Sequence, residues 1–129
     1  MTPPYTKVNL GEVDDSAPGY GFGEIQEARF ATGALGTTAT GVCLHRLHPG
    51  RRAPFAHRHA EAEEVYVVVG GSGRIRLDDD VVELGPLDAV RVAPQVTRQL
   101  ESGPDGLQVL ALGPRHEGDG ELVHGWWID

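Results

Sequence analysis

The sequence predicts an all-β fold, in which short strands form two antiparallel sheets that close into a barrel or jelly roll. The chain has 18 glycines and 9 prolines among 129 residues, and these supply the many turns that short-stranded proteins need. Runs of β-branched and apolar residues recur at roughly ten-residue spacing, each bounded by a turn signal. No segment keeps a helical period beyond a turn or two. At this length we expect one domain with one core.

The first part of the chain leads into the first strands. Residues 1–21 are rich in Pro, Gly, Asp and Ser, so we expect an irregular arm, which is a candidate to lie across a partner subunit. A first strand is expected over residues 23–30, and the small residues of 33–41 predict a loop or a weak strand. Residues 42–48 predict the next strand, which ends at the turn pair Pro49-Gly50.

The second part of the chain alternates strands with short turns. The expected strands are residues 64–69, 74–77, 81–84, 88–92, 96–100 and 107–112, with an acidic hairpin turn at 78–80 and a loop at 103–106. The barrel is therefore expected over residues 23–112. The remainder, residues 113–129, is expected to be a tail in which 116–121 is loop. Its apolar end, 122–128, must be covered, and we expect it to pack at a homodimer interface.

The candidate metal-binding residues lie in one segment between these two parts. Two histidines one residue apart, His57 and His59, point to the same face of an extended segment because side chains alternate along a strand. Four residues allow a turn, after which Glu64 opens a β-branched run that can return beside them. Two imidazoles and a carboxylate suit divalent iron, manganese, nickel or zinc. The sequence therefore predicts His57, His59 and Glu64 as metal ligands.

With Gly50 before it and Gly70-Gly71 after it, this segment resembles the first motif of the cupin superfamily: a glycine, His-x-His, a gap, a glutamate and a closing glycine. Six residues separate Gly50 from His57, where five is usual. The resemblance implies a small single-domain cupin, which is a double-stranded β-helix, or jelly-roll barrel, of two antiparallel sheets. It also implies a divalent transition metal (Fe, Mn, Ni or Zn) as the cofactor.

Residues 87–98 resemble the second motif of the same superfamily in a degraded form. Leu87 stands where the family has a glycine, and Gln95 stands at the turn glycine. Arg98 stands where the family's fourth ligand, a histidine, is expected. The resemblance extends over residues 41–112, and the fourth ligand is absent from its usual position.

Arg98 leaves two models of the site open. A guanidinium is permanently charged and has no free lone pair, so it attracts an anion and repels a cation. In the first model the three ligands hold a metal, and Arg98 neutralises a substrate carboxylate or a bound oxygen species. In the second, Arg98 pairs with Glu64 in the metal's place and leaves an empty or ligand-binding barrel. Arg98 is thus a predicted ligand-binding residue. Tyr66 is another, because it shares the parity of Glu64, although it is equally a core or interface aromatic.

Other polar residues have weaker interpretations. His45 is either structural or a replacement for the missing fourth ligand. Cys43, on an apolar strand, is expected to be a small buried hydrophobe. His124 lies in tail sequence and receives no function. A charge cluster near the expected cavity mouth either forms a solvated face or steers an acidic ligand; it consists of Arg51, Arg52 and Arg58.

Composition excludes several partners. A net charge of −8 with only 11 Lys and Arg argues against binding to nucleic acid or to an anionic membrane, since both depend on dense positive charge. The single cysteine excludes an internal disulfide. No stretch near the start resembles a signal peptide, so a cytoplasmic location is expected.

Two functional hypotheses follow from the resemblance, because cupins range from dioxygenases, isomerases and decarboxylases to storage and sensor proteins. The first is a small metal-dependent enzyme, oxygenase-like or isomerase-like, acting on a small molecule that bears a carboxylate. The second is a non-catalytic small-molecule-binding cupin with Arg98 paired to Glu64 and no metal. A DNA-binding regulator is disfavoured, because the chain offers no helix-turn-helix domain.

Overall fold

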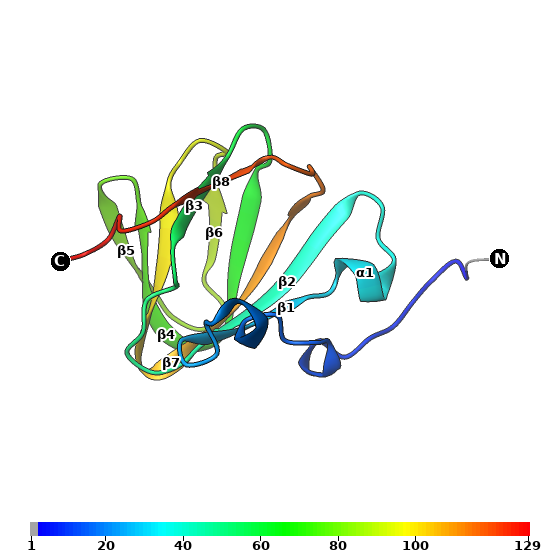
Figure 1. The fold of residues 1–129 in the computed structure, drawn as a ribbon, viewed down its shortest axis with the longest axis horizontal. Coiled ribbons are helices and arrows are strands. Elements are labelled where there is room, and N and C mark those ends of the chain that lie inside the picture. Colours follow the sequence, from blue (N-terminus) through cyan, green and yellow to red (C-terminus); the bar gives the residue numbers. More distant parts are fainter. Residues whose placement is uncertain (1–2) are drawn as a thin grey trace.

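The structure is a computed structural model that describes residues 3–129, and within them eight antiparallel strands wind into a two-layered barrel (Figure 1). The strands are β1 (Gln26–Phe30), β2 (Thr40–Leu47), β3 (Ala56–His59), β4 (Glu64–Leu77), β5 (Asp80–Leu84), β6 (Ala89–Val92), β7 (Arg98–Pro114) and β8 (Gly120–Val123). The helical elements are the 3-10 turns η1 (Leu10–Glu12) and η2 (Pro18–Tyr20) and the short α1 (Thr32–Leu35). None of the helices within 3–129 has the length and apolar character needed to cross a membrane. The predicted all-β class, with antiparallel sheets closed into a barrel, is confirmed.

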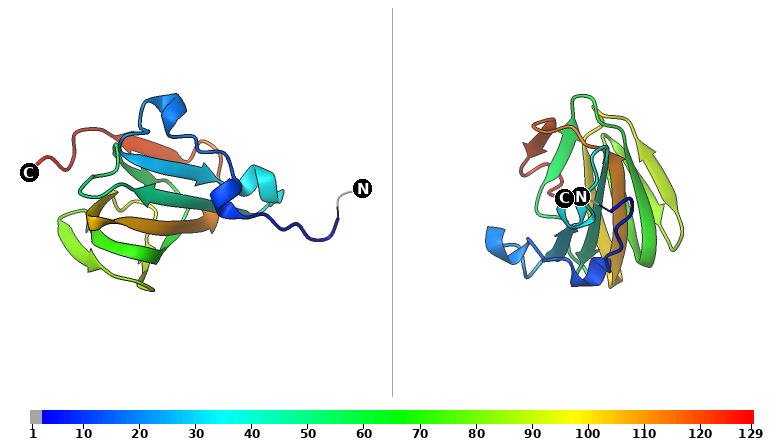
Figure 2. Two further views of the ribbon diagram at one scale, coloured as in Figure 1. Left: turned by 90° about the horizontal axis from the view of Figure 1, so that it is seen from below. Right: turned by 90° about the vertical axis from the view of Figure 1, so that its right-hand side faces the viewer.

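Two long, bent strands, β4 and β7, join the two layers (Figure 2). The first half of β4 pairs with the second half of β7 and with β6, and its second half pairs with the first half of β7 and with β5. Strands β1 and β2 extend the first layer, whereas β3 and β8 extend the second. Strands β3, β4 and β7 therefore meet in the interior, where the first residue of β4 and the first residue of β7 lie near β3.

The expectation that β4 and β7 would each be two separate strands is wrong. The glycine-rich stretch 70–73 and the predicted loop 103–106 both stay in the ladder, and irregularities in register bend the strands there. Gly71 has φ +71°, and a Cβ at this position would lie 2.1 Å from the carbonyl oxygen of Gly106. Only glycine allows the two backbones to cross this closely.

The tail is also more ordered than the sequence suggested. Residues 120–123 form β8, which pairs antiparallel with β3, where a loop up to residue 121 was expected. Beyond β8, the Trp127 ring packs against the guanidinium of Arg52, whose carbon lies 4.3 Å from the ring centroid, and Trp126 stacks on Arg76 in the same way. Much of the apolar end thus covers its own barrel. Homodimer formation stays a prediction.

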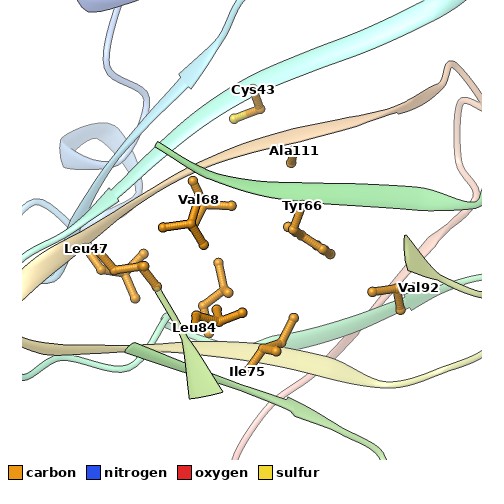
Figure 3. Packing of buried hydrophobic residues seen from close by; sticks show 11 residues of the cluster. Cys43, Leu47, Tyr66, Val68, Ile75, Leu84, Val92 and Ala111 are labelled. Carbon is orange, nitrogen blue, oxygen red and sulfur yellow. The ribbon is translucent and has the colours of Figure 1, made fainter. Parts of the chain in front are cut away.

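A cluster of buried hydrophobic residues between the layers forms the core (Figure 3). Val68, Ile75 and Val109, each at most 1% exposed, form its centre. Cys43, Tyr66, Leu100 and Ala111 form its border, and they also line a cavity that occupies the rest of the interior. The cavity exists because its other walls carry many small residues; among these are Ala28, Gly41, Ala53, Ala62 and Gly113.

Candidate metal centre

The cavity has a volume of about 720 Å³ and is lined by the arm, by β1, β2, β3, β4, β7 and β8, and by the loop before β3. Polar side chains gather on one part of its wall, which we call the polar floor. These side chains are His57, His59, Glu64, Tyr66 and Arg98. All five residues named as site residues by the sequence therefore face the same cavity.

Strand pairing places these side chains. His57 and His59 are alternate residues of β3, which runs between β7 and β8. Glu64 is the first residue of β4 and turns back toward them. Gly113 of β7 lies beside the start of β4, and a Cβ atom added to Gly113 would lie 2.7 Å from the Glu63 carbonyl oxygen. A glycine there lets β7 approach the start of β4 closely enough to close the floor.

Four groups converge on one oxygen, Oε1 of Glu64. The Nε2 atoms of His57 and His59 lie 3.0 and 3.2 Å from it. The Tyr66 hydroxyl donates to it at 2.8 Å, and Nη2 of Arg98 lies 3.1 Å away. The donor atoms of the two histidines and Glu64 all lie within 4.8 Å of one another. The structure thus brings the three predicted ligands together, while their role as metal ligands stays a prediction.

The surroundings of Glu64 set the charge states of the floor. Burial by itself would raise the pKa of Glu64, but hydrogen bonds from His57 and Tyr66 and the charge of Arg98 lower this pKa to about 2. Burial lowers the pKa of His59. Burial and the neighbouring Glu64 charge raise the pKa of Tyr66. At neutral pH the floor therefore offers an ionised carboxylate, a neutral His59 and a protonated phenol.

Arg98 is buried, and its Nε and Nη1 atoms donate hydrogen bonds, whereas Nη2 makes only the charge contact with Glu64. Its side chain is 1% exposed, and Nη1 donates to the carbonyl oxygens of Pro94 at 3.0 Å and Val96 at 2.6 Å. Nε donates to the Tyr66 hydroxyl at 3.4 Å. The contact between Arg98 and Glu64 that the second model requires is therefore present. Direct binding of a ligand by Arg98 stays a prediction, and it requires the guanidinium to leave these acceptors.

The donor set fits a divalent transition metal. Two imidazole nitrogens and one carboxylate oxygen are the ligand types that such ions take, and the charge states above are those that coordination requires. Nδ1 of His59 has no hydrogen-bond partner, but it lies 3.4 Å from Oδ2 of Asp119. A carboxylate behind a ligating histidine fixes the ring's orientation and tautomer. The Arg98 charge opposes an ion here, and Glu64 offsets that charge.

Asp119 was missed by the sequence reasoning. Its carboxylate accepts hydrogen bonds from the backbone N–H groups of residues 60, 61 and 62 at 2.9–3.0 Å, so it joins the tail to the turn between His59 and Glu64. Nothing local marks it, because its partners lie nearly sixty residues earlier in the chain. The expected loop around it concealed a structural link to the floor.

The weaker candidates have different surroundings. His45 lines the cavity, but it is not part of the group of metal-donor side chains found among residues 3–129. Burial, followed by the nearby His57, lowers its pKa to about 4. Burial raises the pKa of the Cys43 thiol to about 12, which makes it a poor nucleophile. In the arginine cluster, Arg52 binds Glu101 at 2.6 Å and Arg58 binds Glu121 at 2.9 Å.

Aromatic side chains form much of the remaining wall, and the sequence reasoning assigned them no role. Phe55, in the loop before β3, meets Phe22, in the segment between η2 and β1, edge-to-face at 5.9 Å between ring centroids. It meets His124 of the tail in the same way at 5.7 Å. These contacts join three segments that are far apart in sequence.

Comparisons with known proteins agree with this architecture. A family model described as "Cupin domain" matches residues 43–111. No curated protein matches the sequence significantly. Among solved structures, a cupin protein from Bacteroides fragilis is similar over 99% of both chains, with 22% identity and a TM-score of 0.71.

Two similar structures are of enzymes. The polyketide cyclase RemF from Streptomyces resistomycificus has a TM-score of 0.74 and 18% identity, over 96% of this chain and 87% of its own. Oxalate decarboxylase from Bacillus subtilis has a TM-score of 0.75 and 17% identity, over 95% of this chain but only 33% of its own. At such identities the likeness shows the fold alone.

Proposed function

This chain belongs to the cupin family, and from that premise we propose that it is a small metal-dependent enzyme of the oxygenase-like or isomerase-like kind. The observation that carries the proposal is the convergence of His57 Nε2 and His59 Nε2 on Oε1 of Glu64, at the edge of a cavity large enough for a substrate. These three residues would hold the ion. A divalent ion bound there supplies Lewis-acid polarisation of a carbonyl or a position at which oxygen is activated.

The neighbouring residues have supporting roles in this proposal. Tyr66 and Arg98 both contact Oε1 of Glu64 and so keep the carboxylate directed toward the histidines. Asp119 places a carboxylate oxygen 3.4 Å from Nδ1 of His59, where its charge favours the tautomer that carries the proton on Nδ1. The apolar remainder of the cavity excludes bulk water from a bound substrate. The similarity to a polyketide cyclase and an oxalate decarboxylase is consistent with an enzyme, and neither reaction is assigned to this chain.

Metal analysis tests the proposal. Four separate samples of the untagged protein are dialysed, each against one of Fe²⁺, Mn²⁺, Ni²⁺ and Zn²⁺. Each sample is then dialysed against metal-free buffer, and its metal content is measured. We expect about one equivalent of at least one of these ions per chain, because the described part of the chain contains one group of three metal-donor side chains. His59→Ala should lose this ion. His45→Phe, which alters another histidine of the same cavity, should retain it. Wild-type protein without stoichiometric metal under all four conditions would overturn the proposal.

A second function is favoured by one specific contact. Arg98 Nη2 lies 3.1 Å from Glu64 Oε1, so the carboxylate already has a counter-charge without an ion. In this alternative the chain is a non-catalytic, metal-free binding protein. Wild-type protein that binds a small molecule in the cavity while holding no metal would favour it.

A further inference from the structure

We propose that the cavity takes an aromatic molecule whose polar group is a single hydroxyl or carbonyl, rather than a small dicarboxylate or a sugar phosphate. This deepens the proposed function: it rests on that function for the site where the polar group would lie, but not on the presence of the ion. Three features of the cavity carry it: its aromatic walls, its charges and its volume.

The aromatic residues of the chain are concentrated on this cavity. The sequence contains three phenylalanines, and Phe22, Phe30 and Phe55 all line the cavity. Tyr20 and Tyr66 line it as well, whereas Tyr5 lies outside it and is 82% exposed. Rings supplied by three segments far apart in sequence present the edges and faces against which another aromatic ring packs at 4.5–7 Å, as a rough rule.

The cavity has no free cation for an anionic ligand. Among its lining residues in the described part of the chain, the only Asp, Glu, Lys or Arg side chains are Glu64 and Arg98, which pair with each other. Arg98 is 1% exposed and its other nitrogens have acceptors. A phosphate or a second carboxylate would therefore lose its hydration without gaining a counter-charge, which is costly.

The volume agrees with this class. A cavity of about 720 Å³ lies in the range that holds drug-sized ligands, so an oxalate-sized ion would leave most of its apolar wall unfilled. An aromatic ligand of one or more fused rings would bury that wall, and its burial would supply most of the binding free energy.

Calorimetric titration of matched probes tests the inference, on the protein as purified and again after EDTA treatment. The probes are 1-naphthol, its saturated analogue decahydro-1-naphthol, glucose 6-phosphate and oxalate. We expect saturable binding of 1-naphthol in both preparations, several-fold tighter than binding of the saturated analogue. After EDTA treatment, neither anion should bind measurably. Absent naphthol binding, equal affinity for the saturated analogue, or tighter binding of either anion in the EDTA-treated protein would overturn it.

Variants locate the binding. Phe55→Leu keeps an apolar side chain and removes the ring, so it should weaken the binding of 1-naphthol at least threefold. Phe30→Ala should have the same effect, and because Phe30 is 57% exposed, the protein should tolerate the change. Tyr5→Ala, which removes an aromatic outside the cavity, should leave the affinity unchanged. Affinity unchanged in both cavity variants would overturn the inference. Metal content measured on the same preparations keeps the two proposals separate: naphthol binding without metal supports this inference against the proposed function, and metal without naphthol binding does the reverse.

Discussion

Nη2 of Arg98 lies 3.1 Å from Oε1 of Glu64, at the position in the sequence where the cupin motif has its fourth metal ligand. The guanidinium is fully enclosed, so this contact is part of the interior and not a surface pair. It places a fixed positive charge beside the carboxylate that a metal would use. In the proposed function this charge lies beside the bound ion, and in the metal-free alternative it takes the ion's place.

Substitution of Arg98 by histidine separates these alternatives. If the wild-type site holds metal through three ligands, Arg98→His should tighten metal binding several-fold or more, because it adds a neutral donor and removes a repelling charge. If Arg98 stands in for an ion, wild type should hold none and the variant should acquire it. Metal content after dialysis distinguishes the two.

The control for this substitution is Arg91→His, on β6, where the arginine side chain is 69% exposed and lies 3.8 Å from Glu63. It should leave metal content as in wild type. An Arg98→His protein with an intact circular dichroism spectrum and no more metal than wild type would contradict both alternatives.

Asp119 should influence the metal from outside its ligand sphere. Asp119→Asn removes the charge 3.4 Å from Nδ1 of His59, so metal affinity should fall by roughly tenfold or more. Glu121→Gln is the matched control, because Glu121 lies on β8 only two residues away but pairs with Arg58 at the surface. Competition with a chelator measures both affinities. Equal losses in the two variants would mean that the tail acts only through stability.

The barrel and most of the polar floor could be predicted because their signals are local. The alternation of His57 and His59 and the return at Glu64 depend on a dozen neighbouring residues. The continuity of β4 through Gly71 could not be predicted, because it depends on Gly106 of another strand approaching it. Local sequence indicated a break there, and tertiary pairing overrode it.

The tail shows the same limit for function. β8 forms because β3 presents an edge to it, and no periodicity within 113–129 reveals that edge. This pairing, which only the folded chain contains, brings Asp119 to the turn at residues 60–62 and His124 to the cavity wall. Arg98, by contrast, could be predicted as a site residue from the sequence, because it stands where the family motif has a histidine.

His45 should make stability depend on acid pH. Its pKa falls from 6.5 to about 4 in the folded protein, so below about pH 6.5 the unfolded chain binds more protons and stability is lost as the pH falls toward 4. The loss has a ceiling of about 1.4 kcal/mol per pH unit. His45→Phe retains a ring against Phe30 and cannot titrate, so its stability should decline less over this window. Urea unfolding of EDTA-treated proteins at pH 4.5 and 7 measures the difference, and identical pH dependence in both proteins would refute the assignment.

Trp127 should anchor the tail to its own barrel. The residue is 7% exposed, its ring lies against the guanidinium groups of Arg52 and Arg74, and its carbonyl oxygen accepts a hydrogen bond from Arg52 at 2.8 Å. Trp127→Ala should therefore lower the free energy of unfolding by about 3 kcal/mol, through lost burial and lost cation–π contact. Ile128→Ala, at a neighbouring site that is 82% exposed, should change it by less than about 0.5 kcal/mol.

Sedimentation of a double variant at two exposed positions tests the expected role of the tail in association. If residues 122–128 formed a dimer interface through their exposed apolar side chains, Leu122 and Ile128 would be its contacts, since they are 54% and 82% exposed. Changing both to Ser should then give monomer while the unfolding free energy stays near that of wild type, because neither side chain is buried in the subunit. A double variant that sediments as wild type would remove the tail from any interface.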